Sequence, residues 1–145
     1  MRVVVSRVKK ASVKVDGKVV GKCDKGLLIL VGFTEGDGEA EIEYLAKKCT
    51  NLRVFDDENG VMNKSIIDIG GNILSISQFT LYGDASKGNR PSYIKALGGE
   101  ESTKLYDKFN EKLRESVTVE TGIFGADMEI EEVKDGPVTI IIDSK

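Results

Sequence analysis

The segment from Ser77 to Thr80 brings two hydroxyls and an amide together at the end of an apolar, strand-like run that begins at Ile73. A second segment, Asp135-Gly136-Pro137, stands directly before another apolar run, Val138 to Ile142. At the end of a strand, a rigid scaffold can present main-chain donors and acceptors to a ligand. These two segments are therefore the first candidates for a binding or catalytic site.

Two roles are open to the hydroxyls of Ser77 and Thr80. The ordinary role is structural, because such side chains often cap a strand by hydrogen bonding to nearby backbone. The other role is nucleophilic attack, which requires an adjacent base to activate the hydroxyl. The chain contains no histidine, the usual base for such a nucleophile and the commonest zinc ligand. Any hydrolysis must therefore take its base from a lysine, a carboxylate or the substrate.

Other candidate residues also have ordinary interpretations. Gly136-Pro137 fits a turn before the last strand, and only about 5–6% of X–Pro bonds in folded proteins are cis. Arg7 follows a short apolar run and fits a solvated charge at a strand end. Phe124 and Met128 lie around a glycine-rich turn and fit core side chains equally well. Residue types alone do not separate these interpretations from a functional site.

The charge balance limits what the protein can attract. The chain has 21 basic and 24 acidic residues and a net charge of −3, so its overall field does not attract a polyanion. Lys87, Arg90 and Lys95 lie in a glycine-rich irregular stretch that follows the Ser77 segment. They are the expected phosphate contacts if RNA is a partner, and otherwise belong to a solvated loop.

Turn signals and hydrophobic patterns predict the strands that position these residues. Asp16-Gly17 predicts the turn of a β-hairpin near the start of the chain. The stretch 26–33 is apolar throughout, which predicts a central strand covered on both faces. Further strand-like runs are 52–55, 73–79, 117–121, 128–133 and 138–142.

Two stretches have the period of amphipathic helices. Between residues 37 and 49, apolar side chains recur with helical spacing, and Lys47-Lys48 near the end suits the helix dipole. The second stretch, 101–117, has apolar residues every four positions: Leu105, Phe109, Leu113 and Val117. One or two helical turns are also expected between residues 92 and 99.

These elements interleave without a linker or repeat, so we expect one domain covering residues 1–145. The pattern predicts an α+β fold with a mixed, mostly antiparallel sheet and two amphipathic helices. No apolar run is long enough for a secretion signal or a membrane span, which predicts a cytoplasmic protein with no membrane partner. Cys23 and Cys49 are isolated, so neither a metal nor another cofactor is expected.

The sequence Ser77-Gln78-Phe79-Thr80-Leu81 resembles the SQFTL motif of the D-aminoacyl-tRNA deacylases. Gly136-Pro137 is similar to the Gly-Pro motif of that family, which often has asparagine where Asp135 stands here. Length, both motifs and their order match, so the resemblance covers Met1 to Lys145. It implies an ester hydrolase that frees tRNA from D-amino acids and mischarged glycine, rejects L-aminoacyl-tRNA and acts in translation quality control.

The resemblance also implies roles for individual residues. Ser77, Gln78, Phe79 and Thr80 would line the pocket, with the main chain orienting the ester and the RNA's own 2′-hydroxyl assisting its cleavage. A cis Gly136-Pro137 bond would lie in a loop that enters the partner subunit's pocket and excludes L side chains. Arg7 would brace that loop through its backbone, while Phe124 and Met128 would be pocket walls.

The family assembles as a homodimer whose sheets combine into a barrel-like core, and its partner is tRNA rather than DNA. Two other interpretations of the sequence stay open. A non-catalytic module that binds tRNA or a nucleotide would fit the absence of histidine, and a small-molecule-binding β-protein of structural role is the third possibility. Release of free amino acid from D-aminoacyl-tRNA separates the first interpretation from the other two.

Overall fold

The computed structural model describes residues 1–144, so Lys145, the last residue of the expected domain, lies outside the described residues. In chain order the elements are β1 (Arg2–Val15), β2 (Lys18–Cys23), β3 (Gly26–Gly32), α1 (Glu39–Asn51), β4 (Phe55–Asp56), β5 (Met62–Lys64), α2 (Ile66–Ile69), β6 (Asn72–Ser77), the 3-10 helix η1 (Phe79–Tyr82), α3 (Gly99–Arg114), β7 (Thr118–Thr121) and β8 (Glu129–Asp143).

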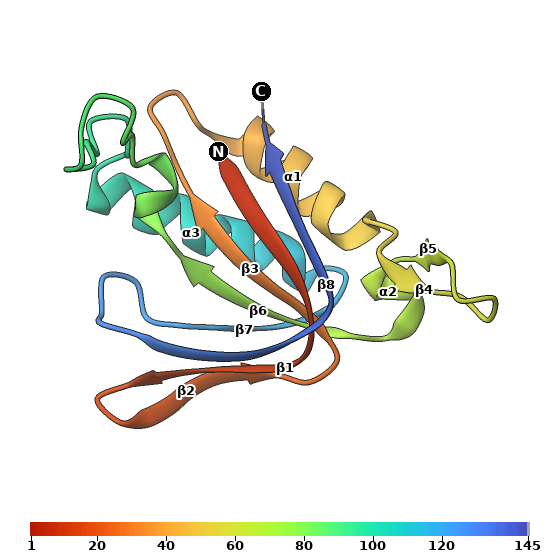
Figure 1. Cartoon of the computed structure of the whole chain (residues 1–145). Coiled ribbons are helices and arrows are strands. Elements are labelled where there is room, and N and C mark those ends of the chain that lie inside the picture. The colour runs from red at the N-terminus through yellow and green to blue at the C-terminus, as the bar shows by residue number, and fades with distance from the viewer. Residues whose placement is uncertain (145) are drawn as a thin grey trace.

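The main sheet is organised around the long first strand. Its strands follow the order β2-β1-β3-β6-β7, and β8 also pairs with β1 (Figure 1). β1 is antiparallel to β2, β3 and β8, whereas β6 is parallel to β3 and β7. The sheet is thus mixed and mostly antiparallel, as the sequence predicts.

The sheet curls until it is almost closed into a barrel. The first half of β1 pairs with β3 and its second half with β2, so the sheet bends along this strand. The β1–β2 hairpin turns at Asp16 and Gly17, which have φ of 51° and 79°, as the Asp-Gly signal predicts. β2 then lies close enough to β7 for the Lys22 N–H to donate to the Glu120 carboxylate, at 3.1 Å.

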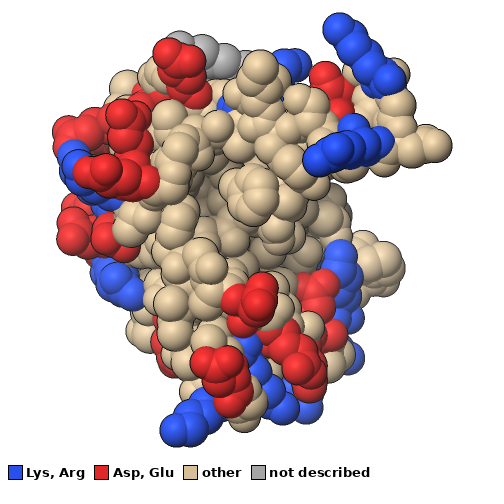
Figure 2. Space-filling model, turned by 90° about the vertical axis from the view of Figure 1, so that its left-hand side faces the viewer, with Lys and Arg blue, Asp and Glu red and all other residues tan. Residues whose placement is uncertain are grey.

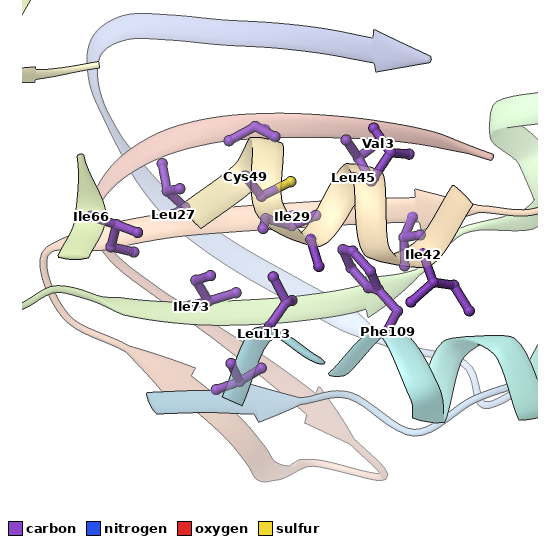
Figure 3. Close-up of a cluster of buried hydrophobic side chains, with 14 of the residues drawn as sticks. Val3, Leu27, Ile29, Ile42, Leu45, Cys49, Ile66, Ile73, Phe109 and Leu113 are labelled. Atoms are coloured by element: carbon purple, nitrogen blue, oxygen red, sulfur yellow. The ribbon is translucent and has the colours of Figure 1, made fainter. Parts of the chain in front are cut away.

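The main core lies between the sheet and the two long helices. Figure 3 shows Leu27 and Ile29 of β3 packed together with Leu45 of α1 and with Phe109 and Leu113 of α3. These five side chains are fully buried. A second cluster fills the opposite face of the sheet: Val8, Ala11, Val13, Cys23, Leu28, Leu74 and Ile76. β3 is therefore covered on both faces, as its continuous apolar sequence predicts.

Three expectations about secondary structure are wrong. Of the expected strand 52–55, only Phe55 lies in a strand, β4 (Phe55–Asp56), because residues 52–54 pair with no strand among residues 1–144. Residues 92–98 form a turn with isolated bridges and no helix, and Gly99 begins α3. The runs 128–133 and 138–142 are parts of one strand, β8, because long β1 pairs with both of them. The one-turn helix α2 and η1 were not expected.

Both amphipathic helices are confirmed, with small shifts in their ends. α1 covers Glu39–Asn51, where residues 37–49 were expected, and α3 covers Gly99–Arg114 in place of 101–117. Tyr106, Phe109 and Leu113 form the buried stripe of α3, while Leu105 is only half-buried. Within residues 1–144, no helix is both long and apolar enough to cross a membrane.

Candidate active site

The segment that follows β6 turns sharply away from the sheet. Gln78 N–H donates to the carbonyl of Val31 in β3 at 2.7 Å, and η1 begins at the next residue, Phe79. The first N–H groups of a helix have no acceptor within that helix. The N–H groups of Phe79 and Thr80 therefore have no acceptor within η1 and lie as main-chain donors where the strand ends.

The close approach of this segment to β3 depends on Gly32. A Cβ atom at residue 32 would lie 2.9 Å from the Gln78 carbonyl oxygen and 3.2 Å from the Leu81 Cβ atom. Such distances are too short for ordinary contacts, so a larger residue would displace the start of η1. The sequence places a glycine at the end of the central strand because the backbone of residue 78 passes over it.

Among the described residues, the Thr80 hydroxyl forms no hydrogen bond with a carboxylate, a lysine or another base. Its Oγ1 atom accepts a hydrogen bond from the Gln78 side-chain amide at 2.5 Å. An amide cannot take a proton from a hydroxyl near neutral pH, so this contact orients Thr80 without activating it. The local geometry supports a positioning role for the segment and gives no support to a threonine nucleophile.

Aromatic side chains line the surface next to η1. Phe79 is 57% exposed, and its ring makes an edge contact with Tyr93 at a centroid distance of 5.2 Å. Figure 2 looks onto the side of the molecule that carries η1 and shows a hollowed, uncharged centre with charged side chains around it. This face therefore offers a hollowed, uncharged surface with exposed aromatic side chains to a ligand.

Phe124 and Met128 lie near the same end of β6, in the connection between β7 and β8. The Phe124 ring packs against Tyr106 at a centroid distance of 5.9 Å, and the Tyr106 hydroxyl donates to the Ser75 carbonyl at 2.8 Å. Met128 packs against the second hydrophobic cluster. Both side chains are half-buried, so they combine a core contact with a partly exposed face.

The Gly136-Pro137 segment forms a bulge in the middle of β8. Lys134 pairs with Val8 and Thr139 pairs with Ser6, so four residues of β8 stand opposite Arg7. The Gly136-Pro137 bond is cis, which confirms the form implied by the resemblance. Gly136 has φ of 127°, a conformation that residues with side chains rarely adopt.

Arg7 is buried and holds this bulge against the rest of the molecule. Its Nε atom donates to the Asp135 carbonyl at 3.1 Å, and its Nη1 atom donates to the Val54 carbonyl at 2.7 Å. The Asp135 carboxylate lies 3.4 Å from Nε, and the Asp56 carboxylate lies 3.6 Å from Nη1. The aspartate that departs from the motif's usual asparagine therefore adds an ion pair to the arginine.

The two motifs lie apart within one chain. Ser77 is level with Val31 of β3 and thus with Val3 of β1, whereas the bulge lies opposite Arg7, four residues further along β1. At a rise of about 3.3 Å per residue, this separation is roughly 13 Å along the strands. β8 and β6 also lie on opposite sides of the β1–β3 pair. One chain does not bring the two motifs into one pocket.

Sequence reasoning missed a second arginine that holds the candidate site. Arg2 donates to the Leu81 carbonyl of η1 at 2.9 Å and lies over the Tyr82 ring at 5.1 Å. It also forms an ion pair with Asp143 of β8 at 2.7 Å. Burial raises the pKa of Tyr82 to about 12. No sequence signal indicated this role, because the contact joins residues 79 positions apart.

Lys87 and Arg90 project from an exposed loop that follows η1. This loop is closed by reciprocal backbone hydrogen bonds between Asp84 and Ser92, at 2.8 and 2.9 Å. Lys95 is also exposed, and its carbonyl accepts a hydrogen bond from the Thr34 hydroxyl. The loop thus carries positive charge close to the aromatic surface formed by Phe79 and Tyr93.

Comparison with known proteins identifies the family of this chain. A family model described as D-Tyr-tRNA(Tyr) deacylase matches residues 4–143. The chain belongs to this family. D-aminoacyl-tRNA deacylases from Clostridium acetobutylicum and from the Langeland strain of Clostridium botulinum are each 56% identical to it over 146 residues. Each alignment covers 100% of this chain and 98% of the relative.

Two solved structures also resemble this member of the deacylase family. One, named c-Myc DNA Unwinding Element Binding Protein, is 39% identical with a TM-score of 0.95, and the match covers 100% of this chain and 99% of the other. The second, a probable eukaryotic D-amino acid tRNA deacylase, is 16% identical with a TM-score of 0.84 and 97% coverage of both chains. The second likeness shows a shared fold.

Proposed function

We propose that the chain hydrolyses the ester bond of D-aminoacyl-tRNA, releasing the free D-amino acid and tRNA while rejecting L-aminoacyl-tRNA. Glycyl-tRNA would also be a substrate, because a site that excludes an L side chain does not exclude a residue with no side chain. The chain acts as a single domain in the cytoplasm. Family membership over residues 4–143 supports the reaction, and the arrangement around η1 supports the mechanism.

The observation that carries the proposal is that the site offers main-chain N–H groups to a ligand, while the Thr80 hydroxyl hydrogen bonds to no base among the described residues. The N–H groups of Phe79 and Thr80 open η1 beside the exposed aromatic rings, while the Thr80 hydroxyl hydrogen bonds only to an amide among the described residues. The N–H groups would hold the ester carbonyl and stabilise the charge that develops on its oxygen. The neighbouring 2′-hydroxyl of the terminal ribose lies beside the scissile carbonyl in the substrate itself, which provides proximity.

Selection between D and L substrates would come from the Gly136-Pro137 bulge of a second copy. The bulge and the Ser77 segment lie apart in one chain, so a complete pocket requires a homodimer in which the sites are shared across subunits. Main-chain carbonyls of the bulge would face the α-carbon of the bound amino acid. An L side chain would then meet the loop, whereas a D side chain would point away from it.

Phosphates near the end of the tRNA would contact Lys87, Arg90 and Lys95. These side chains lie in the exposed stretch beside Phe79 and Tyr93, and none of the three forms an ion pair with a carboxylate among residues 1–144. Phe124 and Met128 would complete the apolar wall.

Release of free D-tyrosine from D-tyrosyl-tRNA by the purified protein tests this function. The protein is first treated with a chelator, and L-tyrosyl-tRNA serves as the matched substrate. We expect rapid release from the D substrate and little from the L substrate. Equal release from both would refute chiral selection, and no release from either would refute the reaction.

A second candidate function is binding of nucleic acid without catalysis. The specific observation that favours it is the name of the structure with a TM-score of 0.95, a DNA Unwinding Element Binding Protein. The same assay separates the two functions, because a binding module would retain D-tyrosyl-tRNA without cleaving it. Competition by duplex DNA in the binding measurement would then show whether DNA or RNA is preferred.

A further inference from the structure

A groove lined by positively charged side chains lies at the C-terminal end of α1. It encloses about 450 Å³ and is lined by Tyr44, Lys47, Lys48, Asn51, Leu52 and Arg53. η1 lies on the left of Figure 1 and this end of α1 on the right, so the groove is distinct from the aromatic surface beside η1. The candidate site described above does not use these six residues.

The three cations of the groove are available to an external anion. Within residues 1–144, none of them forms an ion pair with a carboxylate, whereas Lys104, Lys108 and Lys112 of α3 are all paired. Arg53 instead donates to the carbonyl and side-chain oxygens of Asn63, which are neutral. All three side chains are exposed. An unpaired cluster is notable in a chain whose net charge is −3.

An aromatic ring forms part of the same groove. The Lys48 ammonium lies 5.7 Å from the centroid of the Tyr44 ring, and this ring is 46% exposed. Surfaces that bind single-stranded nucleic acid combine cations for the backbone with aromatic rings for the bases. The Asn51 side chain adds a polar group that can bond to sugar or phosphate oxygens.

The groove is connected to the Gly136-Pro137 bulge through Arg7. Arg53 directly precedes Val54, whose carbonyl accepts from Arg7, and the same guanidinium donates to the Asp135 carbonyl. A nucleic acid lying in the groove would thus pass close to the bulge. In a shared site, the bulge of one subunit and the Lys87 loop of the other would lie on opposite sides of the same substrate.

We propose that this groove binds phosphates of the tRNA strand whose 3′ end occupies the partner subunit's pocket. The identity of the RNA rests on the proposed function, and the charge complementarity rests on Lys47, Lys48 and Arg53 alone. The groove of one subunit and the loop with Lys87 and Arg90 of the other would together hold the end of the tRNA. The protein then needs no overall positive charge to bind a polyanion.

The test uses the Lys47→Ala/Lys48→Ala double variant, because both side chains are exposed and alanine maintains a helix. The matched control is Lys18→Ala/Lys25→Ala, which removes two exposed lysines outside the groove that form no ion pair within residues 1–144. Affinity for uncharged tRNA is measured from 50 to 300 mM salt. We expect the groove variant to bind about ten-fold more weakly at low salt, with the slope of log K against log salt reduced by about 1.5. The control should change neither quantity by as much.

A second measurement separates this inference from the proposed function. The ratio of kcat/KM for D-tyrosyl-tRNA to kcat/KM for D-tyrosyl-adenosine should fall in the groove variant, because only the tRNA reaches the groove. If the wild type binds tRNA but cleaves neither substrate, the proposed function is refuted. The salt dependence of tRNA binding alone then shows whether the groove binds phosphates. An unchanged slope, an equal effect of the control pair, or a change in oligomeric mass would overturn the groove proposal. If polyglutamate binds as tightly as tRNA, the ligand of the groove is an acidic polypeptide, and the proposal is overturned in that case too.

Discussion

At the scale of single residues, the candidate site contains polar groups that orient, and among residues 1–144 the Thr80 hydroxyl forms no hydrogen bond with a base. Thr80 shows this most directly, since its hydroxyl accepts from the Gln78 amide. Arg7 shows it as well, because each of its strong contacts is with a carbonyl or carboxylate of the scaffold. Catalysis by positioning does not depend on a side-chain nucleophile, whereas nucleophilic catalysis does. Mutation of Thr80 can therefore distinguish the two mechanisms.

Thr80→Ala is expected to retain deacylase activity within about ten-fold of the wild type. A true nucleophile lost in this way would cost several orders of magnitude. Single-turnover release of D-tyrosine from D-tyrosyl-tRNA measures the effect. As a companion substrate, tRNA ending in 2′-deoxyadenosine should be almost inert. A dead Thr80→Ala variant that still folds, or normal turnover of the deoxy substrate, would contradict positioning by the main chain.

Arg7→Lys should lower deacylation of D-tyrosyl-tRNA and narrow the difference between D and L substrates. Lysine keeps the charge, but one ammonium cannot replace a planar fork that reaches the Val54 and Asp135 carbonyls together. Loss of one charged hydrogen bond is worth about 1.5–3 kcal/mol, or ten-fold and more in rate if the loop shifts. Arg114→Lys, which alters a carbonyl contact at the end of α3, is the control. If the rates for the D and the L substrate are both unchanged from the wild type, Arg7 does not position the loop.

At the scale of elements, the site depends on how closely the segment after β6 approaches β3. Gly32→Ala would place a methyl group 2.9 Å from the Gln78 carbonyl oxygen. Such crowding typically costs about 1–3 kcal/mol, and here it would also displace the N–H groups of η1. We expect a lower Tm together with a fall in kcat. Gly99→Ala, at a helical position where no described atom lies within 4 Å, should lower neither Tm nor kcat. A fully active Gly32→Ala variant would contradict the requirement for close approach.

Elements with a strong local signal could be predicted from sequence. The Asp16-Gly17 turn, the apolar strand β3 and the stripe of α1 each follow from residue types within a short window. The expected helical turns at 92–99 failed because Asp84 pairs with Ser92 and Thr34 with Ala96, and such long-range bridges leave no local pattern. The prediction of two separate strands in place of β8 failed for the same reason, since β1 pairs with β8 on both sides of the bulge.

Part of the candidate site could likewise be predicted from sequence and part could not. The motif residues could be found from sequence because they lie together at strand ends. The arginines that hold them in place could not. Arg2 reaches Leu81, and Arg7 reaches both Val54 and Asp135, across separations of 47 to 128 residues. Only the register of β1 with β3 and β8 brings these groups together.

At the scale of the whole molecule, buried thiols link stability to alkaline pH. Burial raises the pKa of Cys49 to about 12, whereas a thiol in the unfolded chain has a pKa of about 8.5. The folded form keeps the thiol neutral, so its contribution is complete below pH 8.5 and is lost as pH rises towards 12.

The free energy of unfolding should therefore fall as the pH increases from 8.5 to 11, with Cys49 contributing about 1.4 kcal/mol for each pH unit. Urea titrations at several pH values measure this dependence. Cys49→Ala removes the ionisable group and should have a flatter pH dependence, even though its stability at pH 7 is lower. Parallel pH curves for the two proteins would mean that the Cys49 thiol has the same pKa in the folded and the unfolded chain, so that burial does not raise it.

The separation of the two motifs within one chain leads to a prediction about assembly. Each pocket is expected to combine residues 77–80 of one subunit with the Gly136-Pro137 bulge of the other. A hybrid dimer of two variants, one mutated in each motif, can test this. Phe79→Asp would place a charge on the apolar surface of the pocket. Gly136→Val would place a side chain where φ is 127° and where a Cβ atom would lie 3.1 Å from the Arg7 guanidinium. Each variant alone should be inactive.

Mixing the two variants by joint refolding gives the decisive result. In a hybrid dimer with shared sites, both lesions fall in one pocket and the other pocket is intact, because a two-fold axis exchanges the same surfaces reciprocally. Random pairing at equal amounts makes half of the dimers hybrids, so about a quarter of the wild-type sites should recover. If each pocket belonged to one chain, every site would carry a lesion. Hybrid dimers confirmed by mass and still unable to release D-tyrosine would therefore show that the bulge acts within its own subunit.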